Sequence, residues 1–144
     1  MPRDTRPPLA VALLGYGGLI PFVAGALAVV MADVGGAVFA FTLYAVAILA
    51  FLGGVQWGLV MVAPSRDHAL ERLIVGVLAP LIATAALFTG PVSGLGLLLA
   101  GFVGLLAWEG WRRPASVPAW YLPLRLHLTS GVALCLLVVI VSLV

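Results

Sequence analysis

Charge is scarce in this sequence. It contains no lysine, and charged residues make up only 8% of its 144 residues, whereas soluble domains have roughly 25%. Hydrophobic residues reach 64%, and the mean hydropathy is +1.26. A chain of this composition cannot cover its surface with polar groups, which excludes an ordinary soluble domain. The sequence therefore predicts an all-α polytopic membrane protein, folded as a single membrane domain over residues 1–144 in the lipid bilayer.

The basic residues are too few to indicate a nucleic-acid surface. The formal net charge is +2, and every basic residue except the two histidines is one of seven arginines. We attribute this small excess to membrane topology, because arginine near the ends of membrane spans sets their orientation. No nucleic-acid partner is expected.

The residue patterns of common catalytic and metal sites are also missing. The sequence contains no HExxH, GxSxG, CxxC or phosphate-binding Walker loop. Its single cysteine, Cys135, can form no intrachain disulfide. A bis-histidine haem site is disfavoured, because it would require His68 to enter the membrane beside His127. We therefore expect no catalytic residue, no metal ligand and no cofactor, and the chain is not predicted to be an enzyme. The acidic residues all fall in loops or at the ends of hydrophobic runs: Asp4, Asp33, Asp67, Glu71 and Glu109.

Long uncharged runs indicate five membrane-spanning helices. The run from Leu73 to Trp108 has 36 residues without a charge, and as one helix it would measure about 54 Å, nearly twice the thickness of a bilayer core. It must fold back, and the turn signal at Thr89–Gly94 places the reversal there. The predicted helices of this five-transmembrane-helix bundle cover residues 9–31, 38–63, 70–89, 92–111 and 119–143.

The arginines predict the orientation of these spans. With five spans, every arginine falls at the same side of the membrane: Arg3, Arg6, Arg66, Arg72, Arg112, Arg113 and Arg125. By the positive-inside rule this side is the cytoplasm, or the matrix in an organelle. We expect a multi-pass protein of the bacterial inner membrane with a cytoplasmic N-terminus and a periplasmic C-terminus.

Small residues recur every four positions on two of the predicted helices. Such rows allow helix backbones to approach closely, which is how helices associate in lipid. They are expected to serve packing within the bundle, self-association or a dedicated partner protein. The helix-packing residues are Ala50, Gly54 and Gly58 on one helix and Gly96, Ala100 and Gly104 on another.

Several polar and aromatic residues are predicted to lie at a similar depth. Counting 1.5 Å per residue from the arginine-bearing ends puts Tyr16 about 10 Å and Gln56 about 9 Å inside, with Arg125 at a similar or shallower level. Glu109 or Glu71 would supply the counter-charge for Arg125. The alternatives are purely structural roles. Arg125 would extend to the headgroups or form an ion pair, and Gln56 would only link helices by hydrogen bonds. The candidate polar cluster comprises Tyr16, Gln56, Trp57, Tyr121, Arg125 and His127.

Three short blocks resemble one known family. They are Leu14–Phe22 (LGYGGLIPF), Phe51–Gly58 (FLGGVQWG), and Pro118–Tyr121 (PAWY) followed by Leu124–Leu126 (LRL). In this order and spacing they are similar to the DUF3429 family, whose animal members include transmembrane protein 69. The resemblance implies a small multi-span protein of bacterial or mitochondrial inner membranes and supplies no established activity. The family often has histidine where this chain has Gln56, which weakens any metal or haem proposal at that position.

Two classes of function remain open. The favoured one is a non-enzymatic accessory subunit or assembly factor that docks against a larger membrane complex, with a respiratory complex as the suggested partner. The alternative is a small homo-oligomeric transporter or channel with a polar-solute site at Tyr16, Gln56 and Arg125. An enzyme acting on a lipid or quinone is a third and more distant possibility.

Overall fold

The computed structural model describes residues 6–31, 36–63, 68–113 and 117–144. Within these ranges the chain forms helices that are long and apolar enough to cross a membrane five times. The five-span helical bundle expected from the sequence is thereby confirmed. Its helices are α1 Leu9–Gly17, α2 Ile20–Met31, α3 Ala37–Val62, α4 Ala69–Ala86, α5 Pro91–Trp111 and α6 Tyr121–Leu143.

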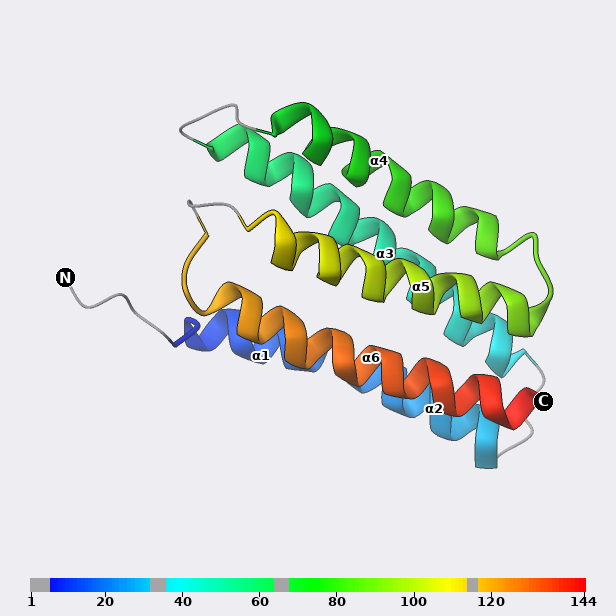
Figure 1. The fold of residues 1–144 in the computed structure, drawn as a ribbon. Coiled ribbons are helices and arrows are strands. Elements are labelled where there is room, and N and C mark those ends of the chain that lie inside the picture. Colours follow the sequence, from blue (N-terminus) through cyan, green and yellow to red (C-terminus); the bar gives the residue numbers. More distant parts are fainter. Residues whose placement is uncertain (1–5, 32–35, 64–67, 114–116) are drawn as a thin grey trace.

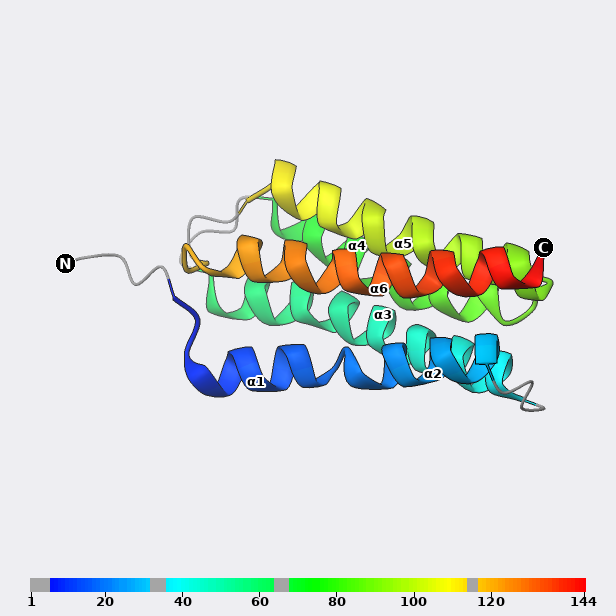
Figure 2. The ribbon, with the colours of Figure 1, turned by 90° about the horizontal axis from the view of Figure 1, so that it is seen from below.

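The first span is broken into two helices. Figure 2 shows α1 and α2 as consecutive segments of one traverse, separated by Gly18 and Leu19. The cause is Pro21, which has no N–H and whose ring clashes with the carbonyl four residues earlier, that of Gly17. The carbonyl oxygen of Gly18 instead accepts a hydrogen bond from the Tyr44 hydroxyl on α3, at 2.9 Å. The break is thus stabilised by a neighbouring span.

The turn between α4 and α5 comes earlier than the hydrophobic pattern indicates. The third span was predicted to continue to residue 89, but α4 ends at Ala86. Tight turns follow at once, because the N–H groups of Leu87 and Phe88 donate to carbonyls only three residues back. The Thr89 hydroxyl donates to the Ala86 carbonyl at 2.9 Å, and Pro91 begins α5 at a position where a missing N–H costs nothing.

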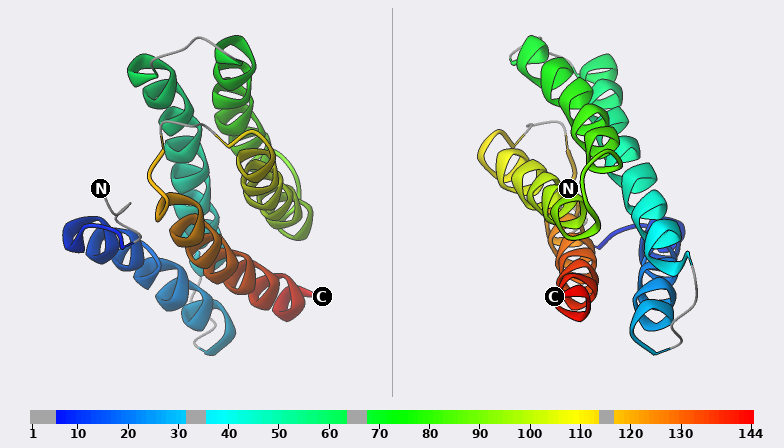
Figure 3. Two further views of the ribbon diagram at one scale, coloured as in Figure 1. Left: turned by 60° about the vertical axis from the view of Figure 1, so that its left-hand side comes forward. Right: turned by 90° about the vertical axis from the view of Figure 1, so that its right-hand side faces the viewer.

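The spans close into a ring. Going around it, α2 packs on α3, α3 on α4, α4 on α5, α5 on α6, and α6 back on α2, while α3 also contacts α5 inside. Figure 3 shows α4 and the α1–α2 span on opposite sides of the bundle. The beginning of α1 and the end of α6 lie at opposite ends of the long axis (Figure 1). The end that carries the start of α1, the start of α4, the end of α5 and the start of α6 is called the arginine end below.

The close crossing of α3 and α4 uses glycines other than those in the predicted rows. A Cβ atom built on Gly53 of α3 would lie 2.7 Å from the carbonyl oxygen of Gly76 on α4, and one built on Gly76 would lie 2.9 Å from that of Gly53. Only glycine permits this contact between backbones. By contrast, a Cβ atom would meet nothing within 4 Å at Gly54, Gly58, Gly96 or Gly104.

Candidate functional site

Four helices carry a buried row of residues at intervals of three and four, the spacing of one helix face. The rows are Ala45, Leu49, Gly53 and Gln56 on α3, Arg72, Gly76, Ala79 and Ala83 on α4, Leu98, Phe102, Leu105 and Glu109 on α5, and Arg125, Thr129, Val132 and Leu136 on α6. Each row has a polar residue at the arginine end and is apolar beyond it, except that α6 also has the buried Thr129. The fold therefore brings four polar side chains together inside the bundle.

Glu109 is the centre of this polar assembly. Its carboxylate is only 2% exposed and accepts three hydrogen bonds from two other helices. Gln56 donates through Nε2 to Oε1 at 2.6 Å, and the Tyr121 hydroxyl donates to the same oxygen at 3.2 Å. Arg125 donates through Nε to Oε2 at 3.0 Å, which makes a buried ion pair. One carboxylate on α5 thus joins α3 and α6.

Arg72 extends the assembly to α4. Its Nη1 donates to Gln56 Oε1 at 3.0 Å, and its Nη2 donates to the backbone carbonyl of Arg112 at the end of α5. Its guanidinium also lies over the Trp108 ring, 5.1 Å from the ring centre. A cation at a helix C-terminus is favoured by the partial negative charge of the free carbonyls there. We call Gln56, Arg72, Glu109, Tyr121 and Arg125 the arginine-end cluster.

A second, half-exposed group surrounds this cluster. Glu71 Oε1 accepts hydrogen bonds from Trp108 Nε1 at 3.0 Å and from Arg112 Nε at 3.1 Å. Its other oxygen lies 3.3 Å from His68 Nδ1. These contacts connect the start of α4 to the end of α5. They also orient the Trp108 ring on which Arg72 is stacked.

The cluster acts as an interhelical connector. Its bonds run between α3, α4, α5 and α6, and each buried carboxylate or amide oxygen in it has at least one donor. A buried ion pair adds little net stability compared with apolar packing, but removing one member leaves the other charge uncompensated. The arrangement therefore fixes which helix faces meet and at what depth.

The residues expected to form one polar site divide into three places. Gln56, Tyr121 and Arg125 meet at Glu109. Tyr16 and His127 lie elsewhere, where the Tyr16 hydroxyl is 3.3 Å from His127 Nδ1 in exposed surroundings. The triad of Tyr16, Gln56 and Arg125 suggested for a solute site is thus not assembled within this chain.

Trp57 also lies apart from the cluster. Its side chain is 42% exposed, and its ring covers Gly76 at the α3–α4 crossing, where a built Cβ atom would lie 2.6 Å from Trp57 Cδ1. This large ring therefore packs against a helix that offers no side chain at the point of contact. Its neighbours on α4 are apolar, including Leu73 and Val77.

The sequence predicted Glu109 as one of two possible counter-charges for Arg125, and the structure confirms this pair, but sequence reasoning missed Arg72 and the central position of Glu109. It treated Arg72 only as a topology signal and Glu109 as a residue that closes a span or offers a counter-charge. The available signal was the spacing of the buried rows, because Glu109 continues the row of Leu98, Phe102 and Leu105 on α5. Thr129, one turn after Arg125 on α6 and 3% exposed, was not singled out either.

Within the described ranges, no three histidine, cysteine, aspartate or glutamate side chains are grouped so that they could hold a metal ion. The chemistry present is that of guanidinium, carboxylate, amide and hydroxyl groups in one hydrogen-bonded assembly. These groups can bind a polar or anionic group and can fix helices.

Comparison with known proteins identifies a family. No curated protein and no solved structure matches the chain. A family model described as "Protein of unknown function (DUF3429)" matches residues 7–141, which includes all five spans almost completely. This multi-pass helical membrane protein therefore belongs to the DUF3429 family.

Proposed function

We propose that this protein is a non-catalytic component of a larger inner-membrane assembly, acting as an accessory subunit or assembly factor. The observation that carries the proposal is a row of small residues on the outer face of α3, comprising Ala50, Gly54 and Gly58. Gly54 and Gly58 are exposed, and nothing lies within 4 Å of a Cβ atom built on either. A partner helix could approach this face as closely as α4 approaches Gly53.

Glycines inside the bundle and glycines on its outer surface differ in what surrounds them, which supports a docking role for the outer ones. Gly53, Gly76 and Gly101 have side chains or backbone of neighbouring helices against them, with built Cβ atoms 2.6–2.7 Å from the nearest atom. The outward-facing glycines of α3 and α5, including Gly104, have open space instead. Glycine in a helix interior costs stability relative to alanine, so a glycine without an internal contact has no packing role within the isolated chain.

A respiratory complex is the assembly we favour, since the family resemblance points to energy-converting inner membranes. We place the arginine end in the cytoplasm of a bacterial cell and Val144 in the periplasm, following the positive-inside rule. Support comes from Arg6, Arg72 and Arg112, which occur at helix ends on one side of the bundle (Figure 1). Single cysteines introduced at Thr89 and Val117 should react with an impermeant reagent from the periplasm and the cytoplasm respectively; the reverse pattern would refute this orientation.

The proposed docking surface, formed by Ala50, Gly54 and Gly58 of α3, is tested by purifying the protein from native membranes in mild detergent. The wild-type chain should bring down a defined membrane complex in fixed proportion, and the double variant Gly54→Leu/Gly58→Leu should lose it. Because both positions are open, the variant should still fold. Gly110→Leu is the matched control, since Gly110 is also helical, exposed and without a neighbour within 4 Å, and it should retain the complex.

Three results would contradict the proposal. One is a homo-oligomer without any partner across several detergents. Another is a partner that survives the double substitution on α3 unchanged. The third is loss of the partner from the Gly110 control as well, which would show that added bulk anywhere on the surface disturbs assembly.

A further inference from the structure

A cavity lies next to the arginine-end cluster, between α1, α3 and α6. Its volume is about 150 Å³, and almost all of its lining is apolar. The exposed side chains of Leu14 and Phe51 contribute to its wall, so it reaches the lipid-facing surface of the bundle. Helix α1 forms its outer wall and has no buried residue of its own. The cavity therefore opens to the membrane through the space between α1 and α3.

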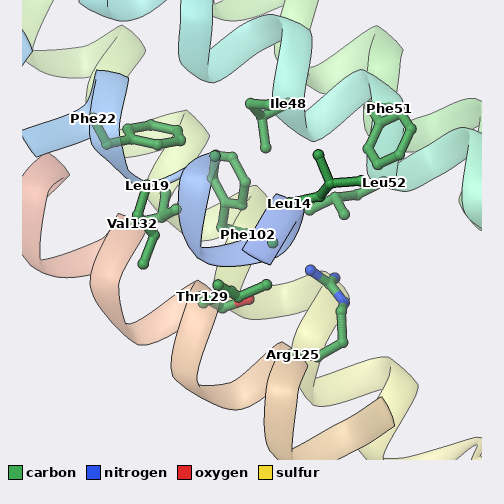
Figure 4. A pocket seen from close by; sticks show the side chains of 13 residues that line it. Leu14, Leu19, Phe22, Ile48, Phe51, Leu52, Phe102, Arg125, Thr129 and Val132 are labelled. Carbon is green, nitrogen blue, oxygen red and sulfur yellow. The ribbon is translucent and has the colours of Figure 1, made fainter. Parts of the chain in front are cut away.

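Two side chains that line this apolar cavity, Arg125 and Thr129, each carry a buried polar atom without a hydrogen-bond partner. Arg125 is 7% exposed; its Nε is bound to Glu109, but its Nη2 has no hydrogen-bond partner. Thr129 Oγ1, which often bonds a carbonyl of its own helix, has none here either. Figure 4 shows the Arg125 guanidinium directed away from α6 toward Leu14 and Leu52, with Thr129 farther along the same wall. Buried donors without partners carry a desolvation cost that a bound acceptor would remove.

The net charge of the side chains that are connected to Arg125 by hydrogen bonds favours an anion as that acceptor. Three arginines, Arg72, Arg112 and Arg125, stand against two glutamates, Glu71 and Glu109, in the connected hydrogen-bond assembly. One positive charge is left over among these five side chains. Uncompensated charge at membrane depth is costly, and charge-assisted bonds from a guanidinium to an anionic oxygen are the strongest hydrogen bonds available to it.

The shape of the cavity favours one acyl chain behind the anionic group. Arg125 lies about 6 Å along α6 from its start, and Val132, at the far side of the cavity, lies about 10 Å deeper. The polar end is thus toward the membrane surface and the apolar end, near Phe22 and Val132, toward the membrane centre. An apolar cavity of this volume accepts a benzene-sized group, which suits a segment of a single chain and leaves no room for two chains side by side.

We propose that this cavity binds a single-chain amphiphile of the membrane, with its anionic oxygen on Arg125 Nη2 and Thr129 Oγ1 and its first methylenes along Phe22 and Val132. A free fatty acid and a lysophosphatidate share this chemistry. None of Ala50, Gly54 and Gly58 lines this cavity, so the site can exist whether or not the protein is a subunit of a larger assembly.

The proposal is tested by native mass spectrometry of the full chain in non-ionic detergent. Four probes with related chains are compared: oleate, 1-oleoyl lysophosphatidate, methyl oleate and octadecene. One oleate or one lysophosphatidate should bind per chain, and the tighter of these two identifies a carboxylate or a phosphate head. Methyl oleate should bind at least about tenfold more weakly, as expected when a charge-assisted hydrogen bond is lost. Equal binding of methyl oleate or octadecene would overturn the assignment of an anion.

Variants locate the binding in this cavity. Arg125→Lys keeps a cation for Glu109 but lacks the second guanidinium nitrogen, and it should weaken binding of the anion at least about tenfold. Thr129→Val should weaken it by a smaller factor. Ile48→Phe places extra bulk in the cavity wall and should abolish binding, whereas Leu43→Phe, at an exposed position of α3 away from the cavity, should leave it unchanged. If Arg125→Lys does not fold, unchanged binding in Ile48→Phe is by itself sufficient to overturn the proposal.

Discussion

The two ends of the bundle use their polar side chains in different ways. At the arginine end, Gln56, Glu109 and Arg125 bond from helix to helix. At the Val144 end, hydroxyl groups bond within one helix or its turn: Thr42 donates to the Val38 carbonyl at 2.8 Å and Ser142 to the Val139 carbonyl at 2.7 Å. Among the described residues, side-chain hydrogen bonds between helices therefore gather at the arginine end, apart from the bond of Tyr44 to the carbonyl of Gly18 at the break in the first span.

Close packing connects the helices at the other end. Gly94 of α5 lies directly against the backbone carbonyl of Ala86 on α4, and Ala83 and Leu49 are fully buried. Small residues let backbones approach and gain van der Waals contact. Close packing is therefore the main contact between helices where the chain is apolar, with the Tyr44–Gly18 hydrogen bond in addition. The hydrogen bonds at the arginine end additionally fix the relative depth of the helices and the helix faces that meet.

The largest expected effect is the loss of Glu109. Glu109→Ala leaves the Arg125 guanidinium buried without its counter-charge and should lower the free energy of unfolding by about 3–5 kcal/mol. Unfolding in mixed micelles, followed by circular dichroism, measures this. The exposed Arg113→Ala is the control and should change stability by less than about 0.5 kcal/mol.

A double variant sharpens the same test. Glu109→Leu together with Arg125→Leu removes both charges and should restore most of the stability, because apolar side chains can replace a buried ion pair at little cost. A double variant as unstable as Glu109→Ala would contradict this account. It would show that the two side chains stabilise the fold through contacts other than the neutralisation of each other's charge.

An intermediate effect is expected at the α3–α4 crossing. Gly53→Ala puts a methyl group against the Gly76 carbonyl, where 2.7 Å is available, and should cost about 1–3 kcal/mol through overpacking. Its sequence neighbour is the control: Gly54→Ala meets open space and should leave stability unchanged or raise it by up to about 1 kcal/mol. Equal effects at the two positions would contradict the close crossing seen here.

The smallest changes in stability are expected from substitutions of one buried amide, Gln56, and one hydroxyl, Thr42. Gln56→Leu removes a donor to Glu109 and an acceptor for Arg72, and should cost about 1–2 kcal/mol. Thr42→Val, at the opposite end, removes only a bond within its own helix and should cost less than about 0.5 kcal/mol. Thermal unfolding of both variants in the same detergent tests the contrast, and a reversed order would mean that the ends do not differ in the proposed way.

Much of the fold could be predicted from the sequence because membrane spans depend on local properties. The uncharged runs and the turn signal at Thr89–Gly94 were sufficient for five spans, since hydrophobic length and helix-breaking residues act over short stretches. The break at Gly18 was harder to predict. It required the combined effect of Pro21 and a hydrogen bond that the hydroxyl of Tyr44, 26 residues away, donates to the Gly18 carbonyl.

The candidate site was only partly predictable. Comparing depths brought Gln56 and Arg125 to one level, but depth does not fix the direction in which a side chain points around its helix. Tyr16 has a suitable depth, yet it contacts His127 and does not reach Glu109. The rotation of each helix about its axis depends on packing against its neighbours. The hydrogen bond between Arg72 and Gln56 therefore could not be predicted from the sequence of either span.

Five membrane crossings and the gathering of the arginines at one end follow directly from the order of the amino acids. Hydrophobicity, chain length and the distribution of charge decide these properties, and all three can be read locally. Which glycines touch another helix, and which polar groups are buried together, depends on how the folded helices pack. The tertiary structure also showed that Arg125 retains a free donor in an apolar cavity, because these facts depend on helix faces contributed by distant parts of the chain.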